Sequence, residues 1–242
     1  MAETVAKLLG VPVPQAYALI KEYGGRVRKA PVEPVLRVRA KAHKLPSNTG
    51  SMGPFHRKYL ERRGFDPDKL ERMWGLLGTG PLSLLDKLNY SRRIIIPIFW
   101  EGEQVSFQGR DITGKAMQKY LACPEEREII KHKHILYRSQ EVSQDYSQCI
   151  CVEGVADVWR IGRWAVATFG IKYTREQLRI LRRFKRVVVW FDEEPQAQQQ
   201  ARKLRMDLSF SGVETEQIFT PKDPADTDPA TVRKLVHKYL DI

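Results

Sequence analysis

The C-terminal part of the chain, from residue 148 onward, alternates short apolar runs with amphipathic stretches. The apolar runs have the length of strands and read CICVEG, AVATFG, RVVVWFD and TEQIFTP. Between and after them, four stretches predict helices: ADVWRIG, TREQLRILRRF, QAQQQARKLRMDLSFSG and DPATVRKLVHKYLDI. Strands that alternate with helices at this spacing predict an α/β fold, a parallel sheet flanked by helices on both faces.

The first 147 residues follow a different pattern. Residues 1–23 predict short helical pieces broken by Pro12 and Pro14, and residues 26–54, with four prolines, predict an extended connector. Helices follow in PFHRKYLERRGF and in DPDKLERMWGLL, where Asp66 is placed to cap and Pro67 takes the first helical position. The runs RRIIIPIFW, EGEQVSFQGRDI and QKYLACP predict a small antiparallel sheet with EGEQ as a turn. We therefore expect an α+β chain overall, divided into residues 1–54, 55–147 and 148–242.

The excess of basic residues in the sequence indicates a kind of binding partner. The chain carries 41 Lys and Arg against 29 Asp and Glu, and residues 1–93 alone hold 18 against 8. A basic excess of this kind favours a polyanionic partner, nucleic acid before a membrane surface, although a solvated basic surface is the simpler alternative. The N-terminus has no long apolar run, so we expect a cytoplasmic protein without a membrane segment. The three cysteines form no CxxC pair, and Cys149 and Cys151 alternate as they would on one face of a strand.

Acidic residues end the predicted parallel strands. Glu153 follows CICV, Asp192, Glu193 and Glu194 follow RVVVWF, and PKDPADTD after the fourth strand adds Asp223 and Asp226. The carboxyl ends of parallel strands meet at one edge of a sheet, so these acids should converge there. Converging carboxylates repel one another unless a cation joins them, and oxygen ligands suit Mg²⁺ or Mn²⁺ better than zinc. The pattern predicts a divalent metal site and no zinc site.

These residues in this order resemble the TOPRIM domain, which replicative primases of bacteria and phages share with topoisomerases and some nucleases. The likeness to the primase version rests on EGVADVWRIG, on AVATFGIKYTREQLRILRRFKRVVVWFD and on KDPAD. It extends upstream through YLERRGFDPDKLERMWGL, RRIIIPIFWEGEQVSFQGRDI, KYLACPEE and KHKHILY, and so covers roughly residues 55–235. The resemblance implies a TOPRIM subdomain at 148–242 and the basic N-terminal subdomain of a primase core at 55–147.

The resemblance also implies roles for particular residues. Glu153, Asp192 and Glu194 would be catalytic metal-binding acids, and the outer metal-binding acids would be Asp157, Asp223 and Asp226. Basic positions that would contact template or nucleotide are Arg93, Arg110 and Lys119, with Lys131 and Lys133 straddling the next lysine of the family pattern. The implied activity is that of a nucleotidyltransferase, a DNA-directed RNA polymerase that makes short RNA primers on a single-stranded DNA template from ribonucleoside triphosphates. Phage or plasmid replication, at the nucleoid or replisome or in a phage-infected host cell, is the implied setting.

The chain departs from the family pattern at several points. Glu194 replaces the second aspartate of the acidic pair, Glu193 stands where glycine is usual, and no zinc ribbon, Walker motif or helicase-binding bundle is present. A separate helicase or zinc-ribbon module is therefore a further expected partner. Two alternatives stay open, a TOPRIM nuclease and a non-catalytic nucleic-acid-binding relic of a primase. A topoisomerase would need a further domain with a catalytic tyrosine.

Some residues have simpler interpretations. We expect Glu193 at the surface and Trp159, Trp164 and Trp190 in the core. The pair His132 and His134 is expected at the surface or facing template. Asp226 and Asp228 are equally open to an outer metal-binding role and to capping the helix that begins at Pro229.

Overall fold

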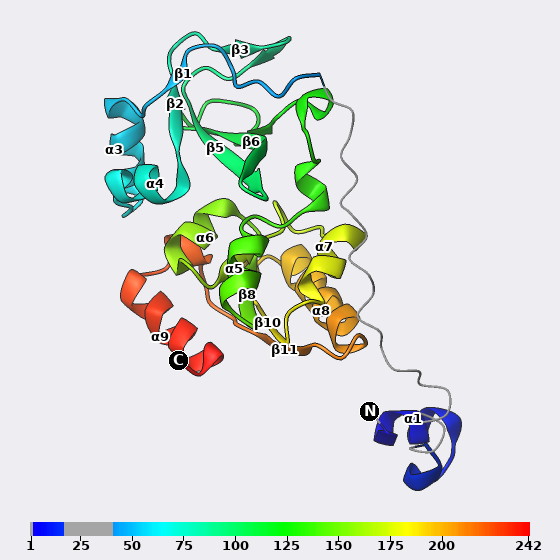
Figure 1. The fold of residues 1–242 in the computed structure, drawn as a ribbon. Coiled ribbons are helices and arrows are strands. Elements are labelled where there is room, and N and C mark those ends of the chain that lie inside the picture. Colours follow the sequence, from blue (N-terminus) through cyan, green and yellow to red (C-terminus); the bar gives the residue numbers. More distant parts are fainter. Residues whose placement is uncertain (1, 17–40) are drawn as a thin grey trace. The chain divides into compact units, whose positions relative to one another are not determined.

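The computed structural model of the protein describes residues 2–16 and 41–242 (Figure 1). The chain forms two compact units, Met1–Pro34 and Val35–Ile242. The first contains α1 (Ala2–Leu9), and its helix gives way to a turn before Pro12, as the sequence predicts, whereas Pro14 lies within the next helical turn, residues 13–16, and does not break it. The expected helical pieces and connector at residues 17–40, with most of the basic run RVRKAPVEPVLRVRAKAHK, lie outside the described residues.

The second unit begins with an antiparallel sheet in the order β1-β2-β5-β6-β7. Its strands are β1 (Thr49–Gly50), β2 (Leu77–Thr79), β5 (Arg93–Trp100), β6 (Glu103–Asp111) and β7 (Tyr120–Ala122). A separate hairpin pairs β3 (Leu84–Leu85) with β4 (Leu88–Asn89). The turn predicted at EGEQ is confined to Glu101 and Gly102, both at positive φ, so that Glu103 already belongs to β6.

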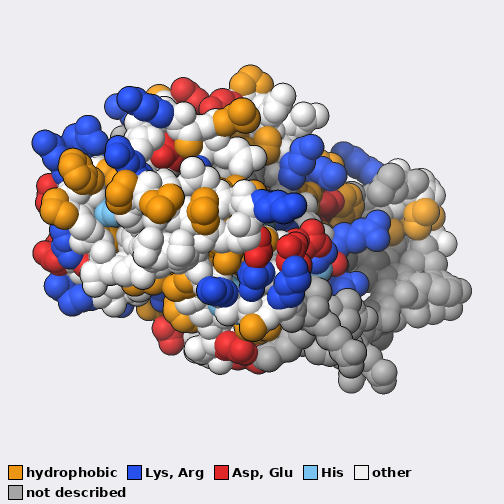
Figure 2. All heavy atoms as spheres, turned by 90° about the horizontal axis from the view of Figure 1, so that it is seen from above, with side chains coloured by type: hydrophobic (Ala, Val, Ile, Leu, Met, Phe, Trp, Pro, Cys, Tyr) orange, Lys and Arg blue, Asp and Glu red, His pale blue; other side chains and the backbone are white. Residues whose placement is uncertain are grey.

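Two helices, α3 (Pro54–Arg62) and α4 (Pro67–Trp74), connect β1 with β2 of this sheet. The predicted cap of α4 is confirmed, because Asp66 accepts a hydrogen bond from the Lys69 backbone N–H and Pro67 takes the first helical position. Gly75 ends the helix in the left-handed region, where a side chain would be strained. Figure 2 looks onto this subdomain from above and shows many Lys and Arg side chains across its face, with hydrophobic side chains between them.

The predicted parallel sheet is confirmed, with all pairs parallel in the order β11-β10-β8-β9. Its strands are β8 (Gln148–Val152), β9 (Ala165–Ala167), β10 (Arg186–Val189) and β11 (Glu214–Gln217). Its helices are α5 (Ser139–Asp145), α6 (Val155–Ile161), α7 (Arg175–Leu181), α8 (Pro195–Ser209) and α9 (Pro229–Leu240). The chain leaves β8 first toward β9 and then crosses back to β10, so right-handed crossovers place α6 and α7 on opposite faces (Figure 1). One face carries α6 packed on α9, and the other carries α7 packed on α8.

The core of this subdomain lies between sheet and helices. Cys149, Cys151 and the valines of β10 are fully buried, as the continuous apolar runs predict. Trp190 is also fully buried, and Trp159 and Trp164 are half-buried against the same core. None of the helices within residues 2–16 and 41–242 has the length and apolar character needed to span a membrane.

Arg160 of α6 joins the two subdomains of the second unit. Its guanidinium donates to the carbonyls of Arg63, Gly64 and Ala225 at 2.9–3.2 Å. It also lies 4.3 Å from the centre of the Phe65 ring. The loop after α3 is thereby held against the segment that follows β11, next to the acids at the sheet edge.

Candidate active site

The acids that end β8 and β10 lie side by side. These neighbouring strands pair Cys151 with Val189, so the residues that follow them emerge at the same edge of the sheet. There the backbone N–H of Asp192 donates to Glu153 Oε1 at 3.0 Å. The convergence predicted from the strand ends is therefore present for these two residues.

Glu153 and Asp192 lie in an environment that opposes their charge. Glu153 is 8% exposed, and burial, followed by the nearby charge of Asp192, raises its pKa to about 8. Burial and the charges of Asp223 and Glu194 raise the pKa of Asp192 to about 6, while Lys119 acts in the opposite direction. Desolvation and like-charge repulsion are the expected reasons for such shifts. The pair would bind a cation with a gain in free energy, because the cation removes both costs.

Asp157 lies beside this pair with both of its oxygens occupied. One accepts from the Gly154 backbone N–H and the other from the Ala225 backbone N–H, each at 3.0 Å. The side chain thus ties the end of β8 to the short helix Pro224–Asp226. Burial, then the charges of Asp223 and Asp192, raises its pKa to about 7. Its contacts are those of a residue that positions the sheet edge.

Asp223 and Asp226 belong to the loop after β11. Asp223 caps the short helix by accepting from the Asp226 backbone N–H at 2.7 Å. Asp226 forms an ion pair with Arg63 at 2.7 Å, and this hydrogen bond lowers the pKa of the Asp226 carboxyl. Asp228 accepts from the Thr231 backbone N–H and so caps α9, the simpler of the two interpretations for that residue.

The last two predicted acids, Glu193 and Glu194, are exposed where the chain enters α8. Glu194 is the residue before the first helical turn and makes no capping hydrogen bond with its side chain. Its charge nevertheless reaches both Glu153 and Asp192, whose pKa values it raises. Glu193 lies at the surface, as expected.

The acids fit a hard divalent cation by their chemistry. They offer oxygen donors alone, which Mg²⁺ and Mn²⁺ prefer, and the pKa values of Glu153, Asp157 and Asp192 are raised by burial first and by repulsion between neighbouring acids second. Within the described part of the chain, no three Asp, Glu, His or Cys side chains are close enough together to hold a metal as they stand. The side chains of Asp192 and Glu194 would have to turn toward Glu153 for an ion to bind.

Two of the predicted basic residues face these acids. Lys119 is exposed between β6 and β7, and its charge lowers the pKa of both Asp192 and Asp226. Arg110 of β6 donates from Nε to the Tyr59 hydroxyl at 2.8 Å and lies 4.8 Å from the centre of the Tyr120 ring. The antiparallel subdomain thus presents cations and tyrosine rings to the acidic edge of the parallel sheet.

The other three predicted basic residues are engaged by the protein itself. Arg93 is 5% exposed and donates to the carbonyls of Gly109 and Gln118. Lys133 donates from Nζ to three carbonyls in the loop after β9, those of Thr168, Phe169 and Lys172. Lys131 pairs with Glu125. The His132 ring forms a hydrogen bond with the buried carboxylate of Glu128, so this histidine has a structural contact inside the protein.

Sequence reasoning assigned no role to Tyr59, Arg63 or Arg160, although all three lie around the site. Tyr59 and Arg63 stand in the segment YLERRGF, which carries part of the family resemblance. That match was the available signal. The contacts with Arg110, Asp226 and the Ala225 carbonyl join segments more than 50 residues apart, which local patterns do not show.

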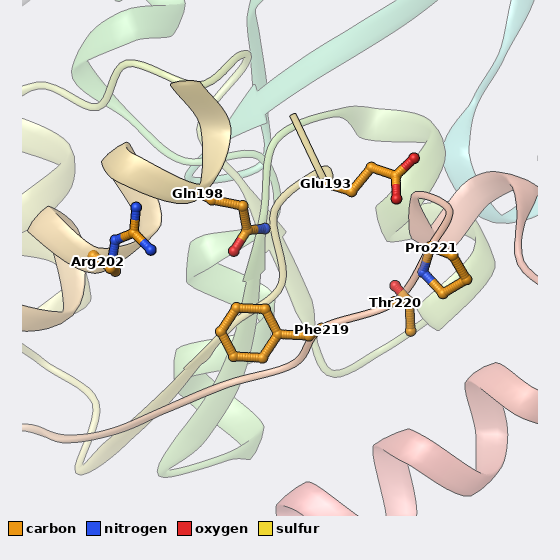
Figure 3. Close-up of a pocket in the computed structure, with 6 residues that line it drawn as sticks. All are labelled: Glu193, Gln198, Arg202, Phe219, Thr220 and Pro221. Carbon is orange, nitrogen blue, oxygen red and sulfur yellow. The ribbon is translucent and has the colours of Figure 1, made fainter. Parts of the chain in front are cut away.

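Two grooves adjoin the acids on either side of the start of α8. One, of about 440 Å³, is lined by Glu193, Gln198, Arg202, Phe219, Thr220 and Pro221 (Figure 3). The other, of about 430 Å³, is lined by Ile171, Glu194, Pro195, Gln196 and Ala197. Each groove contains one of the two exposed glutamates.

The fold and the site together define a class: a parallel α/β domain with an acidic strand-end edge, joined to a basic antiparallel subdomain. Solved structures of the same architecture include the catalytic core of the primase DnaG, with a TM-score of 0.50 at 25% identity, covering 96% of this chain and 73% of that one. The zinc-binding and RNA polymerase domains of the Aquifex aeolicus primase match 98% of this chain and 70% of that chain, with a TM-score of 0.63 and 21% identity. The primase fragment of the bacteriophage T7 primase-helicase shares the fold at a TM-score of 0.52 and 13% identity, over 84% of this chain and 83% of that one.

Sequence comparison leads to the same group. The chain is 31% identical to the DNA primase of Halalkalibacterium halodurans over 172 residues, 57% of this chain and 28% of the relative. It is 32% identical to the DNA primase of Geobacillus stearothermophilus over 111 residues, 43% of this chain and 18% of the relative. No family model matches the chain. The chain is similar in sequence to these bacterial DNA primases, and the matched region spans between 18% and 28% of the length of the relatives.

Proposed function

We propose that this chain is the catalytic core of a DNA primase, a metal-dependent DNA-directed RNA polymerase that makes short RNA primers on single-stranded DNA. One observation carries the proposal: Glu153 and Asp192 meet at the edge of the parallel sheet, opposite Lys119 and Arg110 of the basic subdomain. Phosphodiester formation on a template needs acidic side chains that bind cations at the reacting phosphates. It also needs basic side chains that contact the incoming strand. The homology with bacterial DNA primases supports the same function.

The acids have separate roles in this proposal. Asp192, Glu194 and Glu153 would hold Mg²⁺ or Mn²⁺, with Asp223 and Asp226 as outer acids. A divalent ion bound there supplies charge neutralisation at the triphosphate and a lowered pKa at the primer 3′-hydroxyl. Glu153 Oε1 is held by the Asp192 N–H, which leaves Oε2 to accept the hydroxyl proton. Asp157 keeps the two loops of the edge at a fixed distance through its two backbone hydrogen bonds.

The basic residues divide into contacting and positioning groups. Lys119 and Arg110 are the proposed contacts to template and nucleotide phosphates, because their charges face the site. Arg93 supports Lys119 indirectly, since its guanidinium holds the carbonyl of the preceding residue, Gln118. Lys133 keeps the loop after β9 in place through its three carbonyl contacts. Lys131 remains a proposed contact to nucleic acid. Its ion pair with Glu125 would have to break before it could bind a phosphate.

The substrates of the proposed enzyme are single-stranded DNA and ribonucleoside triphosphates. A replicative helicase and a zinc-ribbon module are proposed partners, because the structural neighbours of this chain include the primase fragment of a primase-helicase and a primase with a zinc-binding domain. Such partners would place the enzyme at a bacterial or phage replication fork.

The test is incubation of the full chain with circular single-stranded DNA, labelled ribonucleotides and Mg²⁺ or Mn²⁺. We expect short labelled RNA that depends on both template and metal. Template cleavage without RNA would replace the proposal with a nuclease, and DNA binding with neither product would indicate a non-catalytic relic.

A further inference from the structure

The groove beside Glu193 has a hydrogen-bonded floor, formed by Gln198 and Thr220, and an exposed rim, formed by Phe219 and Arg202 (Figure 3). Gln198 donates to the carbonyls of Phe191 and Asp192 and accepts from Gln217 at 2.7 Å. Thr220 accepts from the Trp190 indole N–H at 2.8 Å and donates to the Lys222 carbonyl. These bonds tie the floor directly to the strand end that carries Asp192.

The rim residues have no such partners. Phe219 is 66% exposed, although it directly follows the buried Ile218. Arg202 is exposed on α8, and no ion pair or hydrogen bond engages it among the described residues. An aromatic face and an unpaired guanidinium side by side are what an unpaired nucleotide requires, one for its base and one for its phosphate.

We propose that this groove binds one unpaired nucleotide of the single-stranded DNA template, with the base stacked on Phe219 and a neighbouring phosphate on Arg202. The inference rests on the proposed function, which brings template to the adjoining acidic edge. The strand that fits this groove is the template, because the bases of the newly made RNA are paired with DNA and present no free face to an aromatic ring.

Charge also orients the strand. Arg202 lies at one end of the groove and Glu193 lies toward the other, with the Phe219 ring between them (Figure 3). A phosphate is attracted to the Arg202 end and repelled from the Glu193 end, so the sugar-phosphate chain follows α8 while the base edge points toward Glu193. Glu193 thereby acquires a role as the acid that keeps the backbone out of the inner end of the groove.

The experiment uses the full chain and a 12-nucleotide oligodeoxyribonucleotide that contains 5-iododeoxyuridine, without nucleotides or metal. Irradiation should crosslink the DNA to the peptide that contains Phe219. Phe219→Ala should remove this crosslink and weaken binding about five-fold or more, as expected for the loss of one stacked base. The matched control is Phe210→Ala directly after α8, an exposed phenylalanine that does not line the groove and whose loss should change neither result.

Arg202 is tested by the salt dependence of the same binding. Arg202→Gln should lower the slope of log Kd against log salt by about 0.7, the value for one phosphate contact on a single strand. Lys203→Gln, a neighbouring exposed cation that does not line the groove, should lower the slope less. Equal slopes for the two variants would contradict a specific phosphate contact at Arg202.

Three results would overturn the inference. They are unchanged DNA affinity in Phe219→Ala, loss of affinity in Phe210→Ala of the same size, or a Phe219 crosslink that forms with an oligoribonucleotide and not with DNA. Failure of the wild-type protein to make RNA would overturn the proposed function instead, and the binding and crosslinking results would still decide the groove.

Discussion

Two glutamates near one another in space show how position decides the chemistry of a carboxyl group. Glu153 is buried at the end of β8, where burial and Asp192 raise its pKa to about 8. Glu193 follows Asp192 in the chain but is exposed to solvent. A strand that leaves a sheet directs successive side chains to opposite sides, so two adjacent acids can lie in quite different environments.

Glu153 should make metal-free protein less stable as pH rises. Its folded pKa of about 8 lies above its ordinary value of 4.5, so its favourable contribution is complete below pH 4.5 and is lost as pH rises through about 8. Glu153→Gln removes that loss, and the variant should gain about 2–4 kcal/mol relative to wild type between pH 5 and pH 9. Urea unfolding in a chelator at both pH values measures the difference. A gain that is equal at both pH values, or one shared by the exposed control Glu193→Gln, would contradict this prediction.

Metal binding should offset the loss of stability that ionised Glu153 causes. Protons and metal ions compete for the carboxylates, so Mn²⁺ should raise the unfolding temperature of the wild type more at pH 8 than at pH 6. Thermal unfolding with and without Mn²⁺ checks this, with Asp192→Asn as the variant that should lose most of the effect. An increase of equal size in Asp192→Asn would place the ion elsewhere.

At the scale of elements, the loops around the site are held by a few cations with backbone partners. Arg160 connects α6 with the loop after α3 and with the Ala225 carbonyl. Lys133 gathers three carbonyls of the loop after β9. In both cases a charged side chain replaces regular secondary structure as the partner of backbone carbonyls.

Arg160→Ala should destabilise the protein by about 2–4 kcal/mol, because several carbonyls lose their donor and the Phe65 ring loses its cation. The neighbouring Arg163, which is exposed and lies over the Trp164 ring, provides the control, and its replacement by alanine should cost less than about 1 kcal/mol. Denaturant unfolding of the two variants measures both values. Similar costs would mean that Arg160 does not join the subdomains.

Lys133→Met and Lys131→Met separate the two lysines that the sequence could not rank. Lys133→Met should lower the unfolding temperature by several degrees, since three carbonyls lose their donor. Lys131→Met should leave stability nearly unchanged, because an ion pair with an exposed partner contributes little. Calorimetry of both variants decides the matter, and the reverse order would exchange the roles given to them.

The elements also show how far sequence reasoning reaches. The parallel strands and the meeting of Glu153 with Asp192 follow from apolar runs and strand-end acids, which are local signals. Arg93 could not be placed in the same way: an arginine at the start of a strand gives no local sign that its guanidinium folds back onto Gln118. The two backbone partners of Asp157 likewise depend on the packing of the Pro224–Asp226 helix against α6, a contact between distant segments.

At the scale of the whole molecule, charge is distributed unevenly over a chain whose net charge is +12. Lys and Arg side chains are spread over the face seen in Figure 2, with some Asp and Glu among them, while buried acids gather at the edge of the parallel sheet. A nucleic acid strand is attracted by the first, and the acids repel it until cations join them. In the proposed function, this arrangement makes DNA binding separable from catalysis.

That separation has a measurable consequence. Lys119→Gln should weaken binding of single-stranded DNA and reduce its salt slope by about 0.7, whereas Asp192→Asn should leave binding equal or tighter. Fluorescence anisotropy over a series of salt concentrations gives both values. A large loss of DNA affinity in Asp192→Asn would show that the acidic and basic side chains do not act separately.

The most direct test of the account is the metal-dependent formation of RNA by two matched variants. Glu153→Gln and Glu141→Gln make the same chemical change, one inside the acidic cluster and one at an exposed position of α5. In a template-directed assay with ribonucleotides and Mg²⁺ or Mn²⁺, we predict that Glu153→Gln loses at least about 100-fold in rate and that Glu141→Gln keeps the wild-type rate within about three-fold. RNA synthesis by Glu153→Gln at the wild-type rate would contradict the central claim that this sheet edge is the polymerase active site.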